Sequence, residues 1–143
     1  MLKILVHDWS GHPFQIALSR ELARRGFYVH HTYFIGVQGP KGPLERRPND
    51  PPNFVVTGRS IPQTYAKYNF VRRWFQERRY AREIAQFIRA ERPDVVISSN
   101  TPLDVQRAMA KATAAVGGTF VFWLQYIISV AMSTLLGKKY PVL

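Results

Sequence analysis

The sequence predicts an α/β domain with a Rossmann-like, doubly wound and mostly parallel sheet that carries helices on both faces. Two observations lead to this prediction. Short apolar segments alternate along the chain with longer segments whose apolar residues recur at helical spacing, and this alternation is typical of repeated β-α-β units. In addition, 46% of the residues are hydrophobic and 20% are charged, as in ordinary folded domains. Because crossovers between parallel strands are right-handed, few topologies remain.

The chain begins with a strand, a loop and a helix. The apolar run 1–6 predicts the strand, the polar and turn-forming residues 7–12 predict the loop, and residues 13–25 have helical spacing. The helix begins with a proline, which is favoured at the first helical position. Gly26 ends the helix, and residues 27–35 are rich in the β-branched and aromatic types of a second strand.

A loop and a short strand follow. Residues 36–52 contain five of the ten prolines and three glycines, so they predict a loop. Seventeen residues is long for a compact domain, and such loops are either functional covers or disordered. Residues 53–57 predict a short strand, and residues 58–65 predict a connector.

The strongest helix signal lies over residues 68–92. Apolar residues at steps of three and four predict a face that packs on the sheet. They are Val71, Trp74, Phe75, Ala81, Ile84, Ala85 and Ile88. The opposite face carries Arg72, Arg73, Arg79, Arg82 and Arg89. Such a face is either ordinarily solvated or, with Phe and Trp near one end, suited to an anionic membrane surface.

Two further strands and a helix complete the pattern. Residues 94–99 form a continuous apolar run of the kind found in buried parallel strands, and Asn100 and Thr101 follow at its carboxyl end. An alanine-rich helix is predicted over residues 103–115, and residues 119–124 predict the next buried strand.

No charged residue occurs between Lys111 and Lys138, which raises the question of a transmembrane helix over residues 119–136. We reject that interpretation because Gln125 interrupts the run and residues 127–136 have an amphipathic spacing of their own. A strand of about six residues and a helix of about ten explain the stretch better than one span of about twenty.

Composition narrows the classes of function. The 143 residues suffice for one domain, and the absence of cysteine excludes disulfide frameworks, zinc ribbons and thiol catalysis. The amino-terminal apolar run is too short for a signal peptide, so a cytoplasmic location is expected. A formal charge of +11 indicates an anionic partner. No RNP-type motif, zinc finger or lysine tail is present, so nucleic acid is not the expected partner.

The loop after the first strand is the leading candidate for a ligand site. In a parallel sheet it lies at the carboxyl edge, where open α/β folds bind ligands. Gly11 allows close approach of the backbone, and the free N–H groups at the start of the next helix favour an anion such as a phosphate. Ser10 and His12 flank this glycine. The alternative is a plain β-α turn, since one glycine is weaker than a full Gly-rich fingerprint.

The histidines suggest mainly structural roles. His7, Asp8 and His12 form the one close His/carboxylate group in the sequence, but no third and fourth metal ligands follow at a recognisable spacing. We therefore expect no metal site and regard His12 as the better functional candidate. His30 and His31 are neighbours on a strand and so point to opposite faces.

Several segments carry a resemblance to a known family. They are 3–9 with Gly11 and His12, 18–26, 92–102, 120–125 and 135–139. In these segments the chain resembles, over essentially its whole length, the amino-terminal domain of family 4 glycosyltransferases with the GT-B fold, especially bacterial enzymes of the exopolysaccharide and colanic-acid type. The Asn100-Thr101-Pro102 and Phe122-Trp-Leu-Gln125 motifs are its more specific parts.

The resemblance implies a retaining transferase that moves a sugar from a nucleotide-sugar to a saccharide acceptor, commonly lipid-linked, without a metal or cofactor. The amino-terminal domain mainly holds the acceptor. The implied substrate-binding residues are Ser10, Gly11, Asn100, Thr101 and Gln125. His12 and Tyr126 are the implied catalytic residues. Relatives usually have an acidic residue where this chain has Tyr126, and a neutral phenol can donate a hydrogen bond but supplies no carboxylate.

The resemblance also implies a second domain, which binds the nucleotide and is absent from these 143 residues. We therefore expect the chain alone to be inactive. It is either a truncated transferase or works with a separately encoded donor-binding domain, peripherally at the inner face of the plasma membrane. The alternative is a non-catalytic basic α/β module that binds an anionic membrane or a partner protein.

Overall fold

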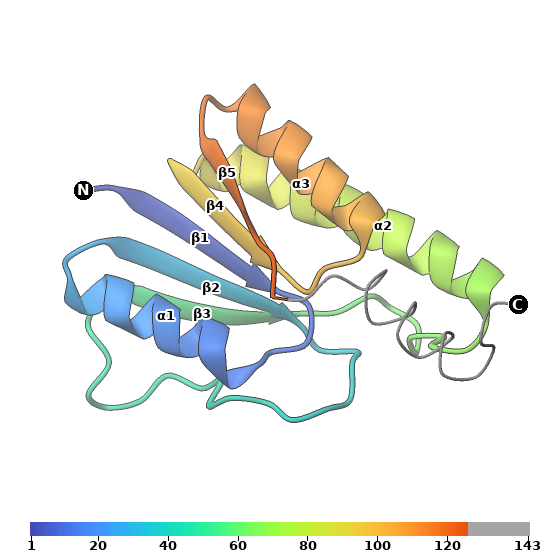
Figure 1. The fold of residues 1–143 in the computed structure, drawn as a ribbon, viewed down its shortest axis with the longest axis horizontal. Coiled ribbons are helices and arrows are strands. Elements are labelled where there is room, and N and C mark those ends of the chain that lie inside the picture. Colours follow the sequence, from blue (N-terminus) through green and yellow to red (C-terminus); the bar gives the residue numbers. More distant parts are fainter. Residues whose placement is uncertain (126–143) are drawn as a thin grey trace, which may run out of the picture.

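A computed structural model describes residues 1–125 as five strands and three helices (Figure 1). In chain order they are β1 (Lys3–Asp8), α1 (Pro13–Arg24), β2 (Tyr28–Phe34), β3 (Phe54–Arg59), α2 (Phe70–Glu91), β4 (Val95–Ser99), α3 (Leu103–Ala115) and β5 (Thr119–Trp123). Tyr126 and the helix predicted over residues 127–136 lie outside the described residues.

The predicted Rossmann-like α/β fold is confirmed. The strand order is β3-β2-β1-β4-β5 and every pair of neighbours is parallel. The first strand is therefore the centre of the sheet, between β2 and β4. Figure 1 shows α1 on one face of the sheet and the adjacent helices α2 and α3 on the other.

Two hydrophobic cores lie on the two faces of the sheet. Ile4 and Val6 of β1 pack with Ile16 of α1 on one face, whereas Leu5 between them packs with Ile84 of α2 and other residues on the opposite face. Alternate side chains of a strand point to opposite faces. Because both faces of β1 are buried, its sequence is a continuous apolar run rather than an alternating one.

The long loop between β2 and β3 covers the α1 face, where no described helix joins these two strands. Gly42 lies so close to α1 that a Cβ atom would be 2.7 Å from Cγ2 of Ile16. The loop is fastened by Arg20, whose Nε donates to Asp50 Oδ1 at 2.8 Å and whose Nη2 donates to the Glu45 carbonyl at 2.8 Å. Both charged side chains of the Arg20–Asp50 pair are almost fully buried. The loop is therefore attached to α1 rather than disordered, and we call it the cover loop; its functional role stays a prediction.

The amino-terminal end of α2 differs from the prediction that its apolar face packs on the sheet. Val71, Trp74 and Phe75 are exposed, and the buried face begins with Gln76 and Tyr80. A helix of 22 residues is about 33 Å long, whereas the strands of five to seven residues span about 17–23 Å. The first turns of α2 therefore extend beyond the sheet, as Figure 1 shows.

The last strand also differs from its prediction as a buried strand. In the described structure β5 pairs with β4 alone, and Phe122 is 50% exposed. The apolar run of β5 thus belongs to an edge of the sheet. Smaller differences occur at two strand ends, because His7 and Asp8 extend β1 and Gly58 lies within β3.

Candidate functional site at the carboxyl edge of the sheet

The predicted ligand residues gather at the carboxyl edge of the three strands β1, β4 and β5. Asp8, the last residue of β1, pairs with Ser99, and Ser99 pairs with Trp123. From β1 the chain turns to α1 on one face, and from β4 it turns to α3 on the other. The strand order therefore reverses between β1 and β4, and this is the position at which open α/β sheets form ligand crevices.

The backbone amides of the loop just before α1 contact a carboxylate of the chain itself. Asp8 accepts hydrogen bonds from the backbone N–H of Ser10 at 3.2 Å and from that of His12. Burial raises the pKa of the Asp8 carboxyl, although these hydrogen bonds act in the opposite direction. These contacts satisfy the amides of Ser10 and His12 without a ligand, whereas no side chain caps the start of α1.

Gly11 is required by the fold whether or not a ligand binds. Its φ is +75°, which disfavours other residues, and a Cβ atom would lie 2.7 Å from Cδ1 of Leu44. Its carbonyl accepts a hydrogen bond from the Gly42 N–H at 2.8 Å. The segment that approaches this glycine closely is therefore the cover loop between β2 and β3.

The other predicted substrate-binding residues follow β4 and β5. Asn100 has a φ of +50°, and its Nδ2 donates to Oε1 of Gln125 at 2.5 Å, so the structure brings these two residues together. Thr101 is buried, and its hydroxyl donates to the Ser99 carbonyl at 2.9 Å. Thr101 therefore stabilises the turn, while Asn100 and Gln125 present amide groups at the edge. Tyr126, the next residue, lies outside the described part.

Helix α1 links the two loops of this edge through a buried amide. Nε2 of Gln15 donates to Oγ of Ser99 at 2.8 Å, and both side chains are fully or almost fully buried. Within the described residues, Oε1 of Gln15 has no hydrogen-bond partner. This contact sets the distance between the start of α1 and the end of β4.

The buried histidines have structural roles, as expected. The ring of His7 stacks on Tyr80, its Nδ1 lies 3.0 Å from Oγ1 of Thr32, and burial lowers its pKa to about 3. On the opposite face, Nδ1 of His31 lies 2.8 Å from Oγ of Ser19, and burial lowers the pKa of His31 to about 3 as well. Residues 1–125 contain no cluster of three potential metal ligands.

Sequence reasoning missed a cavity beside the same edge. Its volume is about 670 Å³, and its walls come from Trp9 after β1, residues 36–38 after β2, the connector 64–69 and Arg73 of α2. Trp9 stacks on Phe34 with ring centroids 4.3 Å apart and meets Tyr65 edge-on. We call this space the Trp9 cavity. The sequence signal that could have indicated this cavity is the presence of aromatic residues just after β1 and just before α2.

The wall of the Trp9 cavity is held by side chains of α2. Oε1 of the buried Gln76 accepts from the Ala66 N–H, and its Nε2 donates to the Thr64 carbonyl, both at 2.8 Å. The Tyr65 hydroxyl donates to Oε1 of Glu77 at 2.7 Å, and burial together with this contact raises the pKa of Tyr65. The connector thus has a defined position beside Trp9.

Comparison with known proteins adds a finding about the fold. No protein-family model matches the sequence, and no curated protein is significantly similar to it. Two crystal structures of the C-terminal domain of a hydrogenase from Pyrococcus furiosus are similar to this chain, with TM-scores of 0.58 and 0.59 at 15% and 14% identity. The matches cover 86% and 85% of this chain and 91% of each hydrogenase chain. At this level of identity the likeness shows a shared α/β fold alone.

Proposed function

We propose that this chain is the acceptor-side domain of a two-domain, GT-B type glycosyltransferase of polysaccharide biosynthesis, with the Trp9 cavity as the pocket for a saccharide acceptor. The enzyme would transfer a sugar with retention from a nucleotide-sugar held by a second, donor-binding domain. The observation that supports this proposal is the position of the cavity. It lies at the carboxyl ends of β1 and β2, and Trp9 in its wall directly precedes Ser10 and Gly11, two of the residues that the family resemblance implies.

The chemistry of the cavity suits a sugar that carries a phosphate. Tyr65 and the exposed Tyr68 provide aromatic surface for the apolar faces of a pyranose ring, and Gln38 and Asn69 provide amide groups for its hydroxyls. Trp9 itself is largely buried, stacked on Phe34 at the base of this wall. Arg73 adds a guanidinium at the rim, where its Nε also lies 3.4 Å from Oε1 of Glu77. A guanidinium group can bind two phosphate oxygens at once, so a phosphate would share Arg73 with this carboxylate. A lipid-linked acceptor has such a phosphate between its sugar and its lipid.

In this proposal, the residues at the carboxyl edge of the sheet have roles that depend on their positions. Asn100 and Gln125 would contact substrate hydroxyls, and the loop of Ser10 and Gly11 would face the donor diphosphate. His12 remains the candidate catalytic residue on this chain, together with Tyr126 outside the described part. No metal or cofactor takes part in the proposed transfer. We place the protein in the cytoplasm.

We expect Arg73→Gln to weaken binding of a short-chain prenyl diphosphate that carries one hexose by at least tenfold. Loss of one charge-assisted bidentate contact corresponds to about 1.5–3 kcal/mol. The measurement is an NMR titration of the 143-residue chain that follows the Trp9 indole N–H resonance. The matched control is Arg72→Gln, which changes the same charge on an exposed neighbour outside the cavity. Equal weakening by the two variants, or no response at Trp9, would contradict the proposal.

A second candidate function, association with an anionic membrane, is favoured by the exposed start of α2. Aromatic and aliphatic side chains gather there. They are Tyr68, Phe70, Val71, Trp74 and Phe75, and we call them the α2 aromatic patch. Cations adjoin the patch, since the Arg78 guanidinium lies 4.5 Å from the Trp74 ring centre and that of Arg73 lies 5.0 Å from the ring centre of Phe70. Over residues 1–125, no helix has both the length and the apolarity needed to cross a bilayer.

We expect the double variant Phe70→Ser, Phe75→Ser to partition at least tenfold less onto vesicles of phosphatidylcholine and phosphatidylglycerol. Each buried Phe ring contributes about 1.5–3 kcal/mol, and tenfold corresponds to 1.4 kcal/mol. Co-sedimentation measures the bound fraction. The control variant Phe14→Ser, Leu103→Ser also removes two exposed apolar side chains, from α1 and α3. Similar losses in the two variants would rule out the α2 aromatic patch as the membrane contact.

A further inference from the structure

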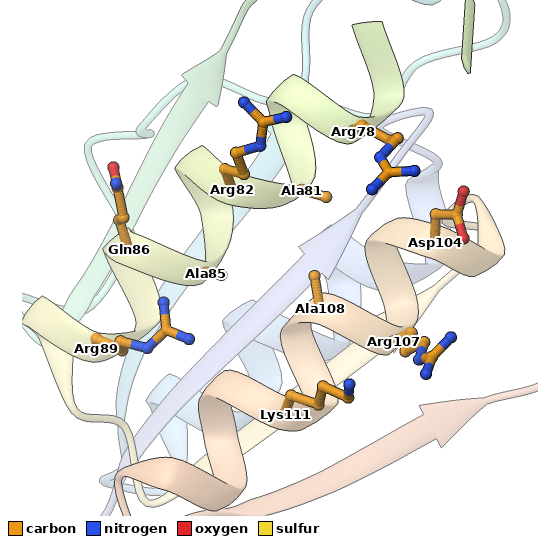
Figure 2. A pocket seen from close by; sticks show the side chains of 10 residues that line it. All are labelled: Arg78, Ala81, Arg82, Ala85, Gln86, Arg89, Asp104, Arg107, Ala108 and Lys111. Atoms are coloured by element: carbon orange, nitrogen blue, oxygen red, sulfur yellow. The ribbon is translucent and has the colours of Figure 1, made fainter. Parts of the chain in front are cut away.

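A groove between α2 and α3 carries an accumulation of positive charge that the proposed transfer does not use. Its volume is about 490 Å³, and three alanines, Ala81, Ala85 and Ala108, line it between the two helices. Figure 2 shows the charged side chains along both helices around these alanines. The cations are Arg78, Arg82 and Arg89 on α2 and Arg107 and Lys111 on α3. We call this the α2/α3 groove.

The five cations of the groove are not neutralised by the described protein. Within residues 1–125 none of them forms an ion pair, whereas Lys3, Arg20, Arg73 and Arg79 each lie within 4.0 Å of a carboxylate oxygen. One acidic residue, Asp104, lies among the five, also without an ion pair there. Arg78 and Arg82, and likewise Arg107 and Lys111, are like charges four residues apart on a helix, an arrangement that destabilises helices slightly.

The arrangement of the cations favours an extended anion over a compact one. Arg78 and Arg89 are eleven residues apart on α2, which corresponds to about 16 Å along the helix axis. Arg107 and Lys111 lie one turn apart on the opposite wall, about 6 Å along the axis of α3. A single phosphate group can therefore contact only neighbouring cations, whereas a chain of phosphates can lie along both rows.

The side chains of the groove also indicate which kind of anion fits. Four of the five cations are arginines, whose planar guanidinium groups match phosphate oxygens. Among residues 1–125, no aromatic side chain lines the groove, so nucleic-acid bases would find no ring there on which to stack. Alanine methyl groups leave room for an anion to lie between the charged rows.

We propose that the α2/α3 groove binds a linear oligophosphate, a chain of several linked phosphate groups that is recognised without bases or sugars. The ligand lies along the groove and contacts arginines of both helices. This inference is independent of the proposed sugar transfer. The groove lies between α2 and α3, and helix α2 is the one element that it shares with the Trp9 cavity.

The test uses the 143-residue chain and inorganic polyphosphate of about fifteen units, with calorimetry at fixed ionic strength. The double variant Arg82→Glu, Arg107→Glu reverses one charge on each wall, and we expect its affinity to fall at least thirtyfold. The control variant Arg24→Glu, Arg25→Glu has the same net charge but alters the exposed end of α1 on the opposite face, and we expect a change below threefold. All four arginines are exposed, and thermal melting verifies that both variants fold.

Three further results decide between this ligand and other anions. Tripolyphosphate is expected to bind at least tenfold more weakly than the long chain, because it reaches fewer cations. Equal losses in the groove and control variants would overturn the proposal in favour of diffuse charge attraction. Tighter binding of poly(U) than of polyphosphate at equal phosphate concentration, or a groove variant that loses only binding to phosphatidylglycerol vesicles, would also overturn it.

Discussion

Replacing Asp50 with alanine is expected to lower the free energy of unfolding by about 3–5 kcal/mol. The side chains of Arg20 and Asp50 are only 4% and 2% exposed, and two bonds of 2.8 and 3.2 Å join them. Asp50 also accepts from the Arg47 N–H at 2.9 Å, and Arg20 donates to the Glu45 carbonyl. Without the carboxylate, a guanidinium would stay buried without its partner and the cover loop would lose its attachment to α1.

Urea denaturation of the variant at neutral pH measures this loss. Glu21→Ala is the control, because Glu21 pairs with Arg24 and Arg25 on the exposed side of the same helix, where ion pairs contribute at most about 1 kcal/mol. The double variant Arg20→Met, Asp50→Leu is expected to recover most of the stability, since apolar replacement of a buried ion pair is often neutral. A loss below about 1 kcal/mol for Asp50→Ala would contradict the role that we assign to the pair.

Acidification from pH 7.5 to pH 5 is expected to reduce the free energy of unfolding by about 4 kcal/mol. Burial lowers the pKa of His7 and of His31 to about 3, whereas the unfolded chain has histidines with a pKa near 6.5. Below pH 6.5 the unfolded state therefore binds protons that the folded state excludes. Each of these histidines therefore lowers the free energy of unfolding by about 1.4 kcal/mol for every pH unit below 6.5, which amounts to about 2 kcal/mol at pH 5.

Urea midpoints measured between pH 7.5 and pH 5 give the pH dependence of the free energy of unfolding. The range ends at pH 5 because ordinary carboxyl groups titrate below this pH. Burial also raises the pKa of Asp8, so protonation of Asp8 favours the folded state as the pH falls and partly offsets the effect of the histidines. Substitution of a histidine distinguishes the two contributions. Burial lowers the pKa of His30 as well, so His31→Gln should remove somewhat less than half of the slope, whatever its effect on absolute stability. NMR spectra should show the rings of His7 and His31 neutral at pH 5. A slope unchanged by His31→Gln would show that other groups cause the acid sensitivity.

The order of elements could be predicted from the sequence, because each strand is a short run of apolar, β-branched or aromatic residues and each helix has its own periodicity. Helix α3 was predicted with its observed bounds, Leu103–Ala115. The exposure of Trp74 and Phe75 could not be predicted in this way, since periodicity identifies an apolar face but does not say where the sheet beneath it ends. The edge position of β5 has a similar cause, because burial depends on neighbours outside the strand.

The candidate site was predictable only in its location. The sequence indicates a helix start at Pro13, but it does not indicate that Asp8 accepts hydrogen bonds from the amides before it. In the sequence, Arg20 and Asp50 resemble ordinary surface charges. Their pairing depends on the cover loop, which places Asp50 against α1. The Trp9 cavity combines segments from three regions of the chain, and such long-range proximity depends on the assembled sheet.

The central position of β1 has a consequence for synthesis on the ribosome. Helix α1, the partner strand β2 and the strand β3 beyond it are translated soon after β1, so the core on the α1 face can assemble first. Its other edge pairs with β4, and the Lys3 N–H that bonds to Asp94 must wait for a residue 91 positions later. Until then the nascent chain has an open strand edge at the middle of the future sheet, where another polypeptide can pair. During the interval before β4 emerges, this edge of β1 is therefore open to pairing with a strand of another chain.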